Sequence, residues 1–135
     1  MRNFKRYKVW ELSHQLVLKI YRITSSFPDN EKYAMVSQMR RAAYSIPSNF
    51  AEGSGRDSDK EFNRFIQISQ GSLYELEYFL LLSRDLGLIE DTIYKELDRE
   101  INNIKSMLDA LSRKLRATAA PSGVSQSAAG TAPTA

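Results

Sequence analysis

The sequence predicts an all-α fold: an antiparallel, up-down-up-down four-helix bundle whose second helix is kinked at Pro47. Apolar residues recur at steps of three and four in four separate stretches, which is the spacing of helices that bury one face. Short connections at Pro28, residues 53–57 and residues 87–90 separate these stretches, so consecutive helices are expected to pack as antiparallel neighbours. The 135 residues, of which 42% are hydrophobic, suit one domain with a packed core.

The first helix is expected from about Tyr7 to Ser26. Its apolar stripe consists of Val9 or Trp10, then Leu12, Leu16, Ile20, Ile23 and Phe27. The residue before a proline is disfavoured in helical backbone, so Phe27-Pro28 ends this helix. Asp29 or Asn30 can then cap the second helix.

The second helix is expected from Glu31 to Glu52, with a stripe of Val36, Met39, Ala43, Ile46 and Phe50. Pro47 lies inside this stripe. A proline removes one backbone donor and clashes with the preceding turn, at a cost of roughly 3 kcal/mol in a helix interior. The helix is therefore expected to kink, or to break and restart, at Pro47. Gly53 is suited to a left-handed cap that stops it.

The third helix begins at a capping box, with Ser58 at the cap and Glu61 three residues later, and is expected to reach Leu86. Its seam consists of Phe62, Phe65 or Ile66, Ser69, Leu73, Leu76, Leu80 and Ser83. Gly71 lies in mid-helix, where a glycine costs roughly 1 kcal/mol relative to alanine. We interpret it as a place where another helix approaches Gly71-Ser72 closely. Gly87 ends the helix as a C′ glycine.

The fourth helix is expected from Asp91 to Arg116 and has the most regular seam: Ile93, Leu97, Ile101, Ile104, Leu108, Leu111 and Leu115. Such a seam suits antiparallel packing. From residue 117 to residue 135 the composition shifts to Ala, Ser, Thr, Pro and Gly, without a charge or an aromatic ring. We therefore predict a bundle over residues 1–116 and a disordered tail over residues 117–135.

Several kinds of catalytic and metal site lack the residues that they need. The chain has no cysteine, which excludes disulfides, thiolate metal sites and cysteine nucleophiles, and fits a reducing cytoplasm. His14 is the single histidine and has no metal-site or triad partners at suitable spacing, which favours a solvated or interface histidine. The carboxylates come without the Glu-x-x-His pairs of diiron bundles. We therefore expect no enzyme activity, no metal and no cofactor.

Neither a signal peptide nor a membrane span is expected. The N-terminal residues are charged and are not followed by a long apolar run. No stretch of about 18 apolar residues exists, because even residues 73–88 contain four charged side chains. We expect a cytoplasmic protein that makes no membrane contact.

Positive charge is concentrated in the first part of the chain, and this favours a polyanion as partner. Residues 1–29 hold six Lys/Arg against two acids, whereas residues 57–88 hold three against six. Lysine and arginine neutralise phosphates, and aromatic rings such as Phe4, Tyr7 and Trp10 can stack on exposed bases. The candidate nucleic-acid-binding residues are Arg2, Lys5, Arg6, Lys8, Arg40, Arg56, Arg113, Lys114 and Arg116.

Most of these cations are expected to lie together. The start of the first helix and the end of the fourth share one pole of an antiparallel bundle, which would gather Arg2, Lys5, Arg6, Lys8, Arg113, Lys114 and Arg116. Two alternatives remain open. Tyr7 and Trp10 can instead pack into the end of the bundle while the lysines keep it solvated, and the basic face of one helix can simply meet the acidic face of another.

A second group of residues is assigned to structure and subunit contacts: Arg41, Pro47, Asn49, Glu52, Gly71, Glu75 and Tyr78. We hypothesise that Arg41 pairs with an acid of the third helix, such as Glu75, or with an acid of a neighbouring subunit. Its replacement by alanine should then reduce assembly or stability before binding. Tyr78, Phe79 and the three leucines after them make the third helix apolar over more than one face, which predicts a homo-oligomer.

The second helix also carries a family resemblance. Arg40-Arg41-Ala42, Ser45-Ile46-Pro47, Asn49, Ala51-Glu52-Gly53 and Arg56 resemble the signature of the bacterial four-helix-bundle family of the 23S rRNA intervening-sequence proteins. The match extends upstream to Trp10, Tyr21 and Phe27-Pro28, and downstream to Phe65, Gly71-Ser72, Glu75-Leu76 and Leu86. That family is similar to the accessory proteins of diversity-generating retroelements, which form barrel-shaped homopentamers and bind nucleic acid and a reverse transcriptase.

The resemblance implies a four-helix bundle that assembles into a ring, with a pentamer as the leading form. It also favours a non-catalytic scaffold that binds nucleic acid, above all structured RNA, through a basic surface. The alternative is a protein–protein adaptor whose ring presents a surface to an enzyme such as a reverse transcriptase, without touching nucleic acid. Salt distinguishes the two, because phosphate binding weakens steeply as salt rises.

Overall fold

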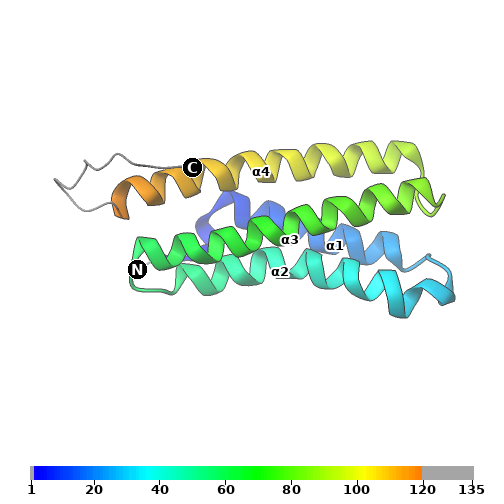
Figure 1. The fold of residues 1–135 in the computed structure, drawn as a ribbon, viewed down its shortest axis with the longest axis horizontal. Helices are drawn as coiled ribbons and strands as arrows, with labels where there is room; N and C mark the ends of the chain where they lie inside the picture. The colour runs from blue at the N-terminus through cyan, green and yellow to red at the C-terminus, as the bar shows by residue number, and fades with distance from the viewer. Residues whose placement is uncertain (1, 120–135) are drawn as a thin grey trace.

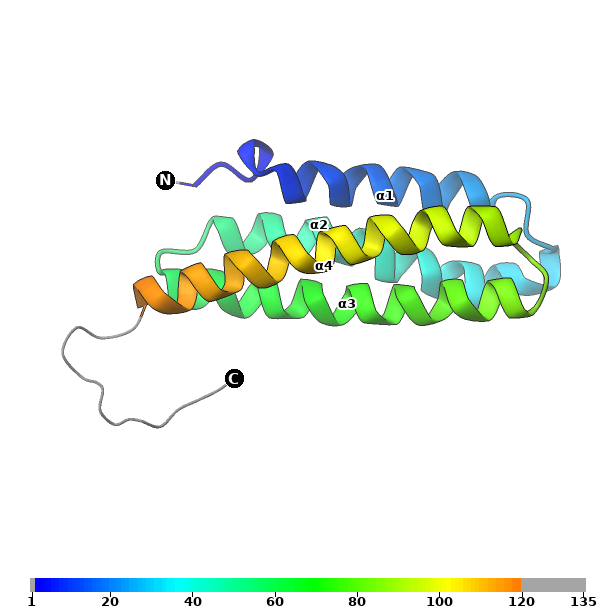
Figure 2. The same cartoon turned by 90° about the horizontal axis from the view of Figure 1, so that it is seen from above.

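Four long helices lie side by side in the computed structural model, which describes residues 2–119 (Figures 1 and 2). They are α1 (Lys8–Thr24), α2 (Ser37–Ser54), α3 (Asp59–Asp85) and α4 (Asp91–Ala119). Short helical turns precede them: η1 (Phe4–Arg6) before α1, and η2 (Asp29–Glu31) and the π-helical η3 (Lys32–Val36) before α2. The predicted up-down-up-down bundle is confirmed, and the described residues contain no strand. α4 includes residues 117–119, and the rest of the predicted tail lies outside the described residues.

The core consists of the stripes that the sequence predicts. Every predicted seam position of α3 is buried, and so are Val36, Met39, Ala43, Ile46 and Phe50 of the second helical segment. In α4 the seam is buried from Leu97 to Leu115 except at Leu111, which like Ile93 is partly buried against the core. α2 packs against both α1 and α3, and eight of its 18 residues are buried, the highest share among the four long helices.

Helix α2 runs through Pro47 without a break. The alternative in which the helix breaks and restarts is therefore wrong, whereas the kink stays a prediction. Side chains of neighbouring helices supply hydrogen bonds to the carbonyls around the proline: Ser69 Oγ donates to the Ile46 carbonyl at 2.8 Å, and Trp10 Nε1 donates to the Pro47 carbonyl at 3.2 Å. These bonds join α3 and α1 to the middle of α2.

The close helix–helix approach occurs at Gly53 and not at Gly71. A Cβ at Gly53 would lie 2.5 Å from Phe65 Cβ, so α3 packs against the bare backbone there. Gly53 is the second-last residue of α2 and lacks a positive φ, which corrects the predicted left-handed cap. A Cβ at Gly71 would meet nothing within 4 Å, so the predicted close approach is absent within the chain. Gly87, with a φ of 76°, is the C′ glycine that the sequence predicts.

Polar contacts fix how α4 lies on its neighbours. Near its start, Lys19 of α1 pairs with Glu100 and, at 3.3 Å, with Glu96. Near its end, Ser112 Oγ donates to Asn63 Oδ1 of α3 at 2.7 Å, inside the core. α4 therefore crosses from the side of α1 towards the start of α3, as the view from above shows (Figure 2).

Candidate nucleic-acid interface

Three segments meet at one end of the bundle: the N-terminal segment with η1, the turn between α2 and α3, and the end of α4 (Figures 1 and 2). The seven cations that the sequence assigns to one pole lie on two of these segments, the first residues of the chain up to the start of α1 and the last turns of α4, and we call them the basic pole: Arg2, Lys5, Arg6, Lys8, Arg113, Lys114 and Arg116. Arg56 lies at the same end, in the turn between α2 and α3. The contacts of each side chain then decide which of them can reach a partner.

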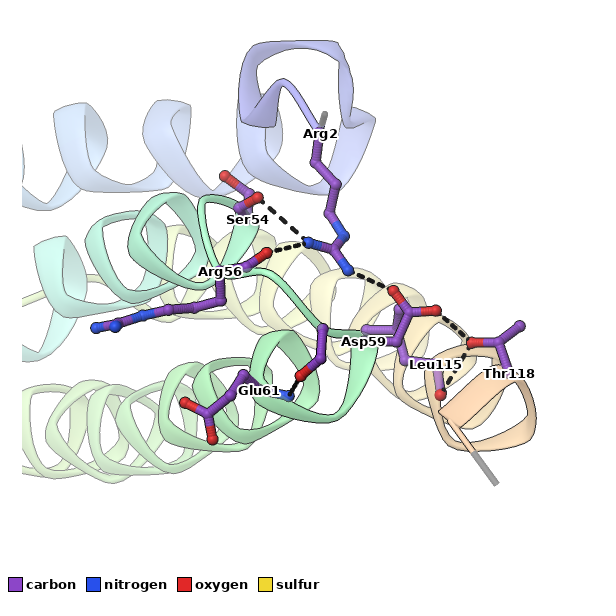
Figure 3. Close-up of polar contacts among 8 residues, drawn as sticks. Arg2, Ser54, Arg56, Asp59, Glu61, Leu115 and Thr118 are labelled. Carbon is purple, nitrogen blue, oxygen red and sulfur yellow. Dashed lines mark hydrogen bonds and ion pairs between the residues drawn. The ribbon is translucent and has the colours of Figure 1, made fainter. Parts of the chain in front are cut away.

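The Arg2 side chain forms its contacts within the fold (Figure 3). Its Nη1 donates to the Arg56 carbonyl at 2.7 Å, and its Nη2 pairs with the Asp59 carboxylate. The guanidinium also lies 4.7 Å from the centre of the Phe62 ring. Only 19% of the Arg2 side chain is exposed, so it ties the N-terminal segment to the α2–α3 turn. Arg2 is therefore a structural residue, and its assignment as a phosphate ligand is not supported by its contacts.

Asp59 is the acid at the centre of this end of the bundle. Besides the ion pair with Arg2, it accepts a hydrogen bond from the Thr118 hydroxyl of α4 at 2.5 Å (Figure 3). The hydrogen bonds from Thr118 and Arg2 hold the pKa of the Asp59 carboxyl below its ordinary value of 3.8. Asp59 thus joins the N-terminal segment, α3 and the last turn of α4.

Arg56 and Glu52 neutralise each other. Arg56 Nη2 lies 2.8 Å from Glu52 Oε2, one helical turn away, and its guanidinium covers the Phe65 ring at 4.8 Å. Both side chains are exposed, so this pair adds little stability. The sequence assigns Arg56 to phosphate and Glu52 to structure without foreseeing that they pair, although their spacing of four residues is a readable signal.

Most of the remaining cations of the basic pole are exposed and have no carboxylate partner within residues 2–119. This holds for Lys5, Arg6, Arg113 and Lys114. Lys8 is only weakly engaged, with Glu11 Oε1 3.7 Å from its ammonium, and Arg116 Nη1 donates to Ser112 Oγ at 2.8 Å. Lys60, in the first turn of α3, is a further exposed cation at this end that the sequence analysis missed. Because Lys60 follows the Ser58 cap by two residues, the sequence alone places it at this end of the bundle.

The aromatic residues of the N-terminal segment serve the core. The Tyr7 ring packs edge-on against Phe50 at 5.2 Å and against Phe62 at 6.0 Å. The indole nitrogen of Trp10 donates a hydrogen bond to α2, and the Trp10 ring stacks on the His14 ring with 5.4 Å between the ring centres. Tyr7 and Trp10 therefore pack into the bundle end, as that part of the alternative predicts, and base stacking by these two rings is not supported. His14 itself is exposed.

Arg40 lies away from the basic pole, in the first turn of α2 beside the end of α1. Its Nε donates to Thr24 Oγ1 at 2.9 Å, its Nη2 donates to the Tyr21 carbonyl at 3.2 Å, and its guanidinium lies 4.4 Å from the Tyr21 ring centre. The fold therefore separates Arg40 from the other candidate phosphate ligands.

The residues assigned to structure divide into two kinds. Asn49 Nδ2 donates to the Ser45 carbonyl at 2.8 Å, and Ser72 Oγ donates to Ser45 Oγ at 3.0 Å, which links α2 to α3. Arg41 and Glu75 are exposed and form no hydrogen bond or ion pair within the described residues. The predicted pairing of Arg41 with Glu75 inside one chain is therefore wrong, and pairing with a neighbouring subunit stays a hypothesis.

Residues 2–119 hold neither a metal-binding cluster nor a membrane-spanning helix. In that part of the chain, no group of three His, Cys, Asp or Glu side chains could hold a metal ion. No helix there combines the length and the apolar character needed to cross a bilayer.

Comparison with protein families decides where this bundle belongs. The family model described as "23S rRNA-intervening sequence protein" matches residues 5–110. The chain belongs to that family. The match covers the second-helix signature, the whole of α1, α2 and α3, and α4 as far as Ala110. The resemblance seen in the sequence is therefore confirmed. No curated protein matches the chain.

A solved structure shows the same fold as this member of the intervening-sequence family. It is a protein of unknown function from the S23 ribosomal protein family of Bacteroides thetaiotaomicron VPI-5482, with a TM-score of 0.72 and 21% sequence identity. The match covers 78% of this chain and 95% of the other. The descriptions of the family and of this neighbour name no catalytic activity.

Proposed function

We propose that this protein is a non-catalytic oligomeric scaffold that binds structured RNA through the basic pole. The observation that carries the proposal is the set of exposed cations without carboxylate partners within residues 2–119, on two segments at the same end of the bundle: Lys5 and Arg6 of η1, and Arg113 and Lys114 near the end of α4. Charges that no acid of the chain neutralises are available to phosphates. The family's description, which refers to 23S rRNA, supports RNA as the polyanion.

Acids near the α2–α3 turn limit the surface that RNA can use. Glu52, Asp57, Asp59 and Glu61 lie in or beside that turn, and all of them except Asp57 are already paired with arginines. We therefore place the RNA contact on the η1 side and the α4 side of the pole. We propose that the RNA backbone passes over the two basic segments and avoids the turn.

Self-association is proposed through the outer face of α3. Tyr74 and Tyr78 are 60% and 57% exposed and lie one helical turn apart, and Gly71 presents bare backbone one turn before them. Tyrosine is enriched at the cores of protein interfaces. A glycine with open space beside it allows a second helix to approach. We propose a ring of copies, with a pentamer as the leading form, held through this face.

The protein–protein adaptor remains the second candidate, because the same exposed tyrosines could receive a partner enzyme such as a reverse transcriptase. The test is binding of a structured RNA hairpin at several salt concentrations, with the mass of the complex measured by light scattering. The proposed scaffold binds RNA at low salt, and log affinity falls linearly with log salt. An adaptor ignores the RNA at every salt concentration.

A charge-neutralised variant makes this test specific to the pole. The double variant Arg113→Gln/Lys114→Gln removes two phosphate contacts and should reduce the salt slope by about 1 to 2. The matched control is Lys95→Gln/Arg99→Gln, which removes the same charge from exposed positions nearer the start of the same helix. Equal losses in both variants would mean that net charge, and not the basic pole, governs binding.

A further inference from the structure

A groove between the end of α1 and the first turns of α2 carries two arginines and no acid. Its volume is about 520 Å³, and the side chains that line it include Tyr21, Arg40, Arg41 and Tyr44. Sites for small ligands have volumes of roughly 300–1,000 Å³. Two grooves between α1 and α4 instead set Lys19 against a glutamate. The α1–α2 groove is therefore positively charged and large enough for a small ligand.

Arg40 is fixed before any ligand arrives. Two of its nitrogens donate to Thr24 and to the Tyr21 carbonyl, and its guanidinium carbon lies 4.4 Å from the centre of the Tyr21 ring. The third nitrogen, Nη1, makes no hydrogen bond within residues 2–119. A cation that is already immobilised loses little side-chain freedom on binding. Arg40 therefore offers a preorganised donor at one wall of the groove.

Arg41 and Tyr44 provide the groups that are free to contact a ligand. Arg41 is exposed without a partner in the described part of the chain, and Tyr44 is 47% exposed and stacks on no ring there. Residues three apart are neighbours on a helix surface, so both side chains lie at the same wall. The planar fork of arginine matches a phosphate, and an exposed aromatic ring is a platform for a base.

We propose that the α1–α2 groove binds one nucleotide, with its phosphate at Arg40 and Arg41 and its base on Tyr44. The source is either an unpaired nucleotide of bound RNA, which rests on the proposed function, or a free mononucleotide, which does not. The groove is separate from the basic pole. Residue 41 and the end of α2 at residue 54 are about 20 Å apart at the helical rise of 1.5 Å per residue.

The test is titration of the full-length protein with 5′-AMP by calorimetry, using the wild type and three variants. Arg41→Gln should weaken binding roughly tenfold, because it removes a charge-assisted hydrogen bond to the phosphate. Tyr44→Leu should weaken it as well, because it removes the stacking platform. Arg22→Gln is the matched control, since Arg22 is an exposed arginine of α1 that lines a groove towards α4. Thermal unfolding verifies that every variant is folded.

Three results would overturn the proposal: wild-type affinity in both groove variants, inorganic phosphate binding as tightly as AMP, or a smaller oligomer for Arg41→Gln. The last would assign Arg41 to a subunit contact. A five-nucleotide adenine RNA identifies the source. If this RNA binds more tightly than AMP, and Arg41→Gln weakens its binding, the source is unpaired RNA. If the RNA and AMP bind equally tightly, the source is a free mononucleotide. If structured RNA does not bind while AMP does, the proposed function fails and the nucleotide groove stands.

Discussion

Gly53 and Gly71 both lie inside long helices, but only Gly53 has a neighbour within reach of a Cβ. Gly53→Ala would force its new methyl group to within 2.5 Å of Phe65 Cβ, which is backbone-anchored and cannot rotate away. We expect a loss of about 1–3 kcal/mol of unfolding free energy, measured by urea denaturation, as for other overpacked cores. Gly71→Ala is the matched control and should stabilise the single chain by up to about 1 kcal/mol, because the site is open. Equal effects at both positions would contradict the close packing of α3 against Gly53.

The carboxyl of Asp59 gives this end of the bundle a defined pH response. Its folded pKa lies below 3.8 because Thr118 and Arg2 donate hydrogen bonds to its ionised form. The stabilisation is therefore fully present above pH 3.8 and disappears as pH falls through the lower folded pKa. We expect Asp59→Asn to be less stable than the wild type at pH 7, and the difference to narrow below pH 3.8 in thermal denaturation.

Asp57→Asn is the control for that pH response. Asp57 is exposed and forms no hydrogen bond or ion pair within residues 2–119. Its replacement should leave the unfolding free energy nearly unchanged at every pH. If Asp59→Asn shows the same flat profile, the contacts with Arg2 and Thr118 do not stabilise the folded protein in solution.

At the level of the element, α4 depends on a buried polar pair for its position against α3. Asn63 and Ser112 are 8% and 2% exposed, and their side chains are joined at 2.7 Å. Asn63→Ala leaves the Ser112 hydroxyl without its buried acceptor, so we expect a loss of about 1–3 kcal/mol in urea denaturation. Asn102→Ala, which removes an exposed hydrogen bond to Asp98 within α4, should change stability by less than about 0.5 kcal/mol. A smaller loss at Asn63 than at Asn102 would contradict this role.

Sequence periodicity predicts the helices well because burial repeats along each element. The seams of α3 and α4 are examples: the steps of three and four from Phe62 to Ser83 all fall on buried positions. The role of a glycine is harder to predict, since it depends on what the partner helix places opposite. For that reason the close approach predicted at Gly71 occurs at Gly53 instead.

The candidate site was predictable only in part. The antiparallel topology places the basic segments at one end, and that much follows from helix order alone. Whether a cation is free depends on contacts between segments far apart in sequence, such as Arg2 with Asp59. The α1–α2 groove was missed for the same reason, because it needs the register that brings Tyr21 beside Arg40.

For the whole molecule, charge and apolar surface lie in different places. The free cations Lys5, Arg6, Arg113 and Lys114 lie at the end of the bundle that holds η1 and the last turns of α4, while the exposed rings of Tyr74 and Tyr78 lie on the outer face of α3. A scaffold needs both, because copies must associate without covering the surface that binds RNA. Ring assembly through α3 would also repeat the basic pole around one axis, and repeated phosphate contacts increase the apparent affinity for a long RNA.

This separation predicts a variant that loses assembly and keeps its fold. Tyr74→Ser/Tyr78→Ser removes two exposed rings from α3, and a truncated aromatic anchor at an interface typically costs about 2 kcal/mol, or roughly thirtyfold in the dissociation constant. Light scattering should therefore show a smaller mass than the wild type at the same concentration, with an unchanged helical circular dichroism spectrum. Leu18→Ser, at a 39% exposed position of α1, is the control and should keep the wild-type mass. A wild-type protein that is monomeric at all concentrations would contradict the proposed assembly, because no second copy would then cover Tyr74 and Tyr78.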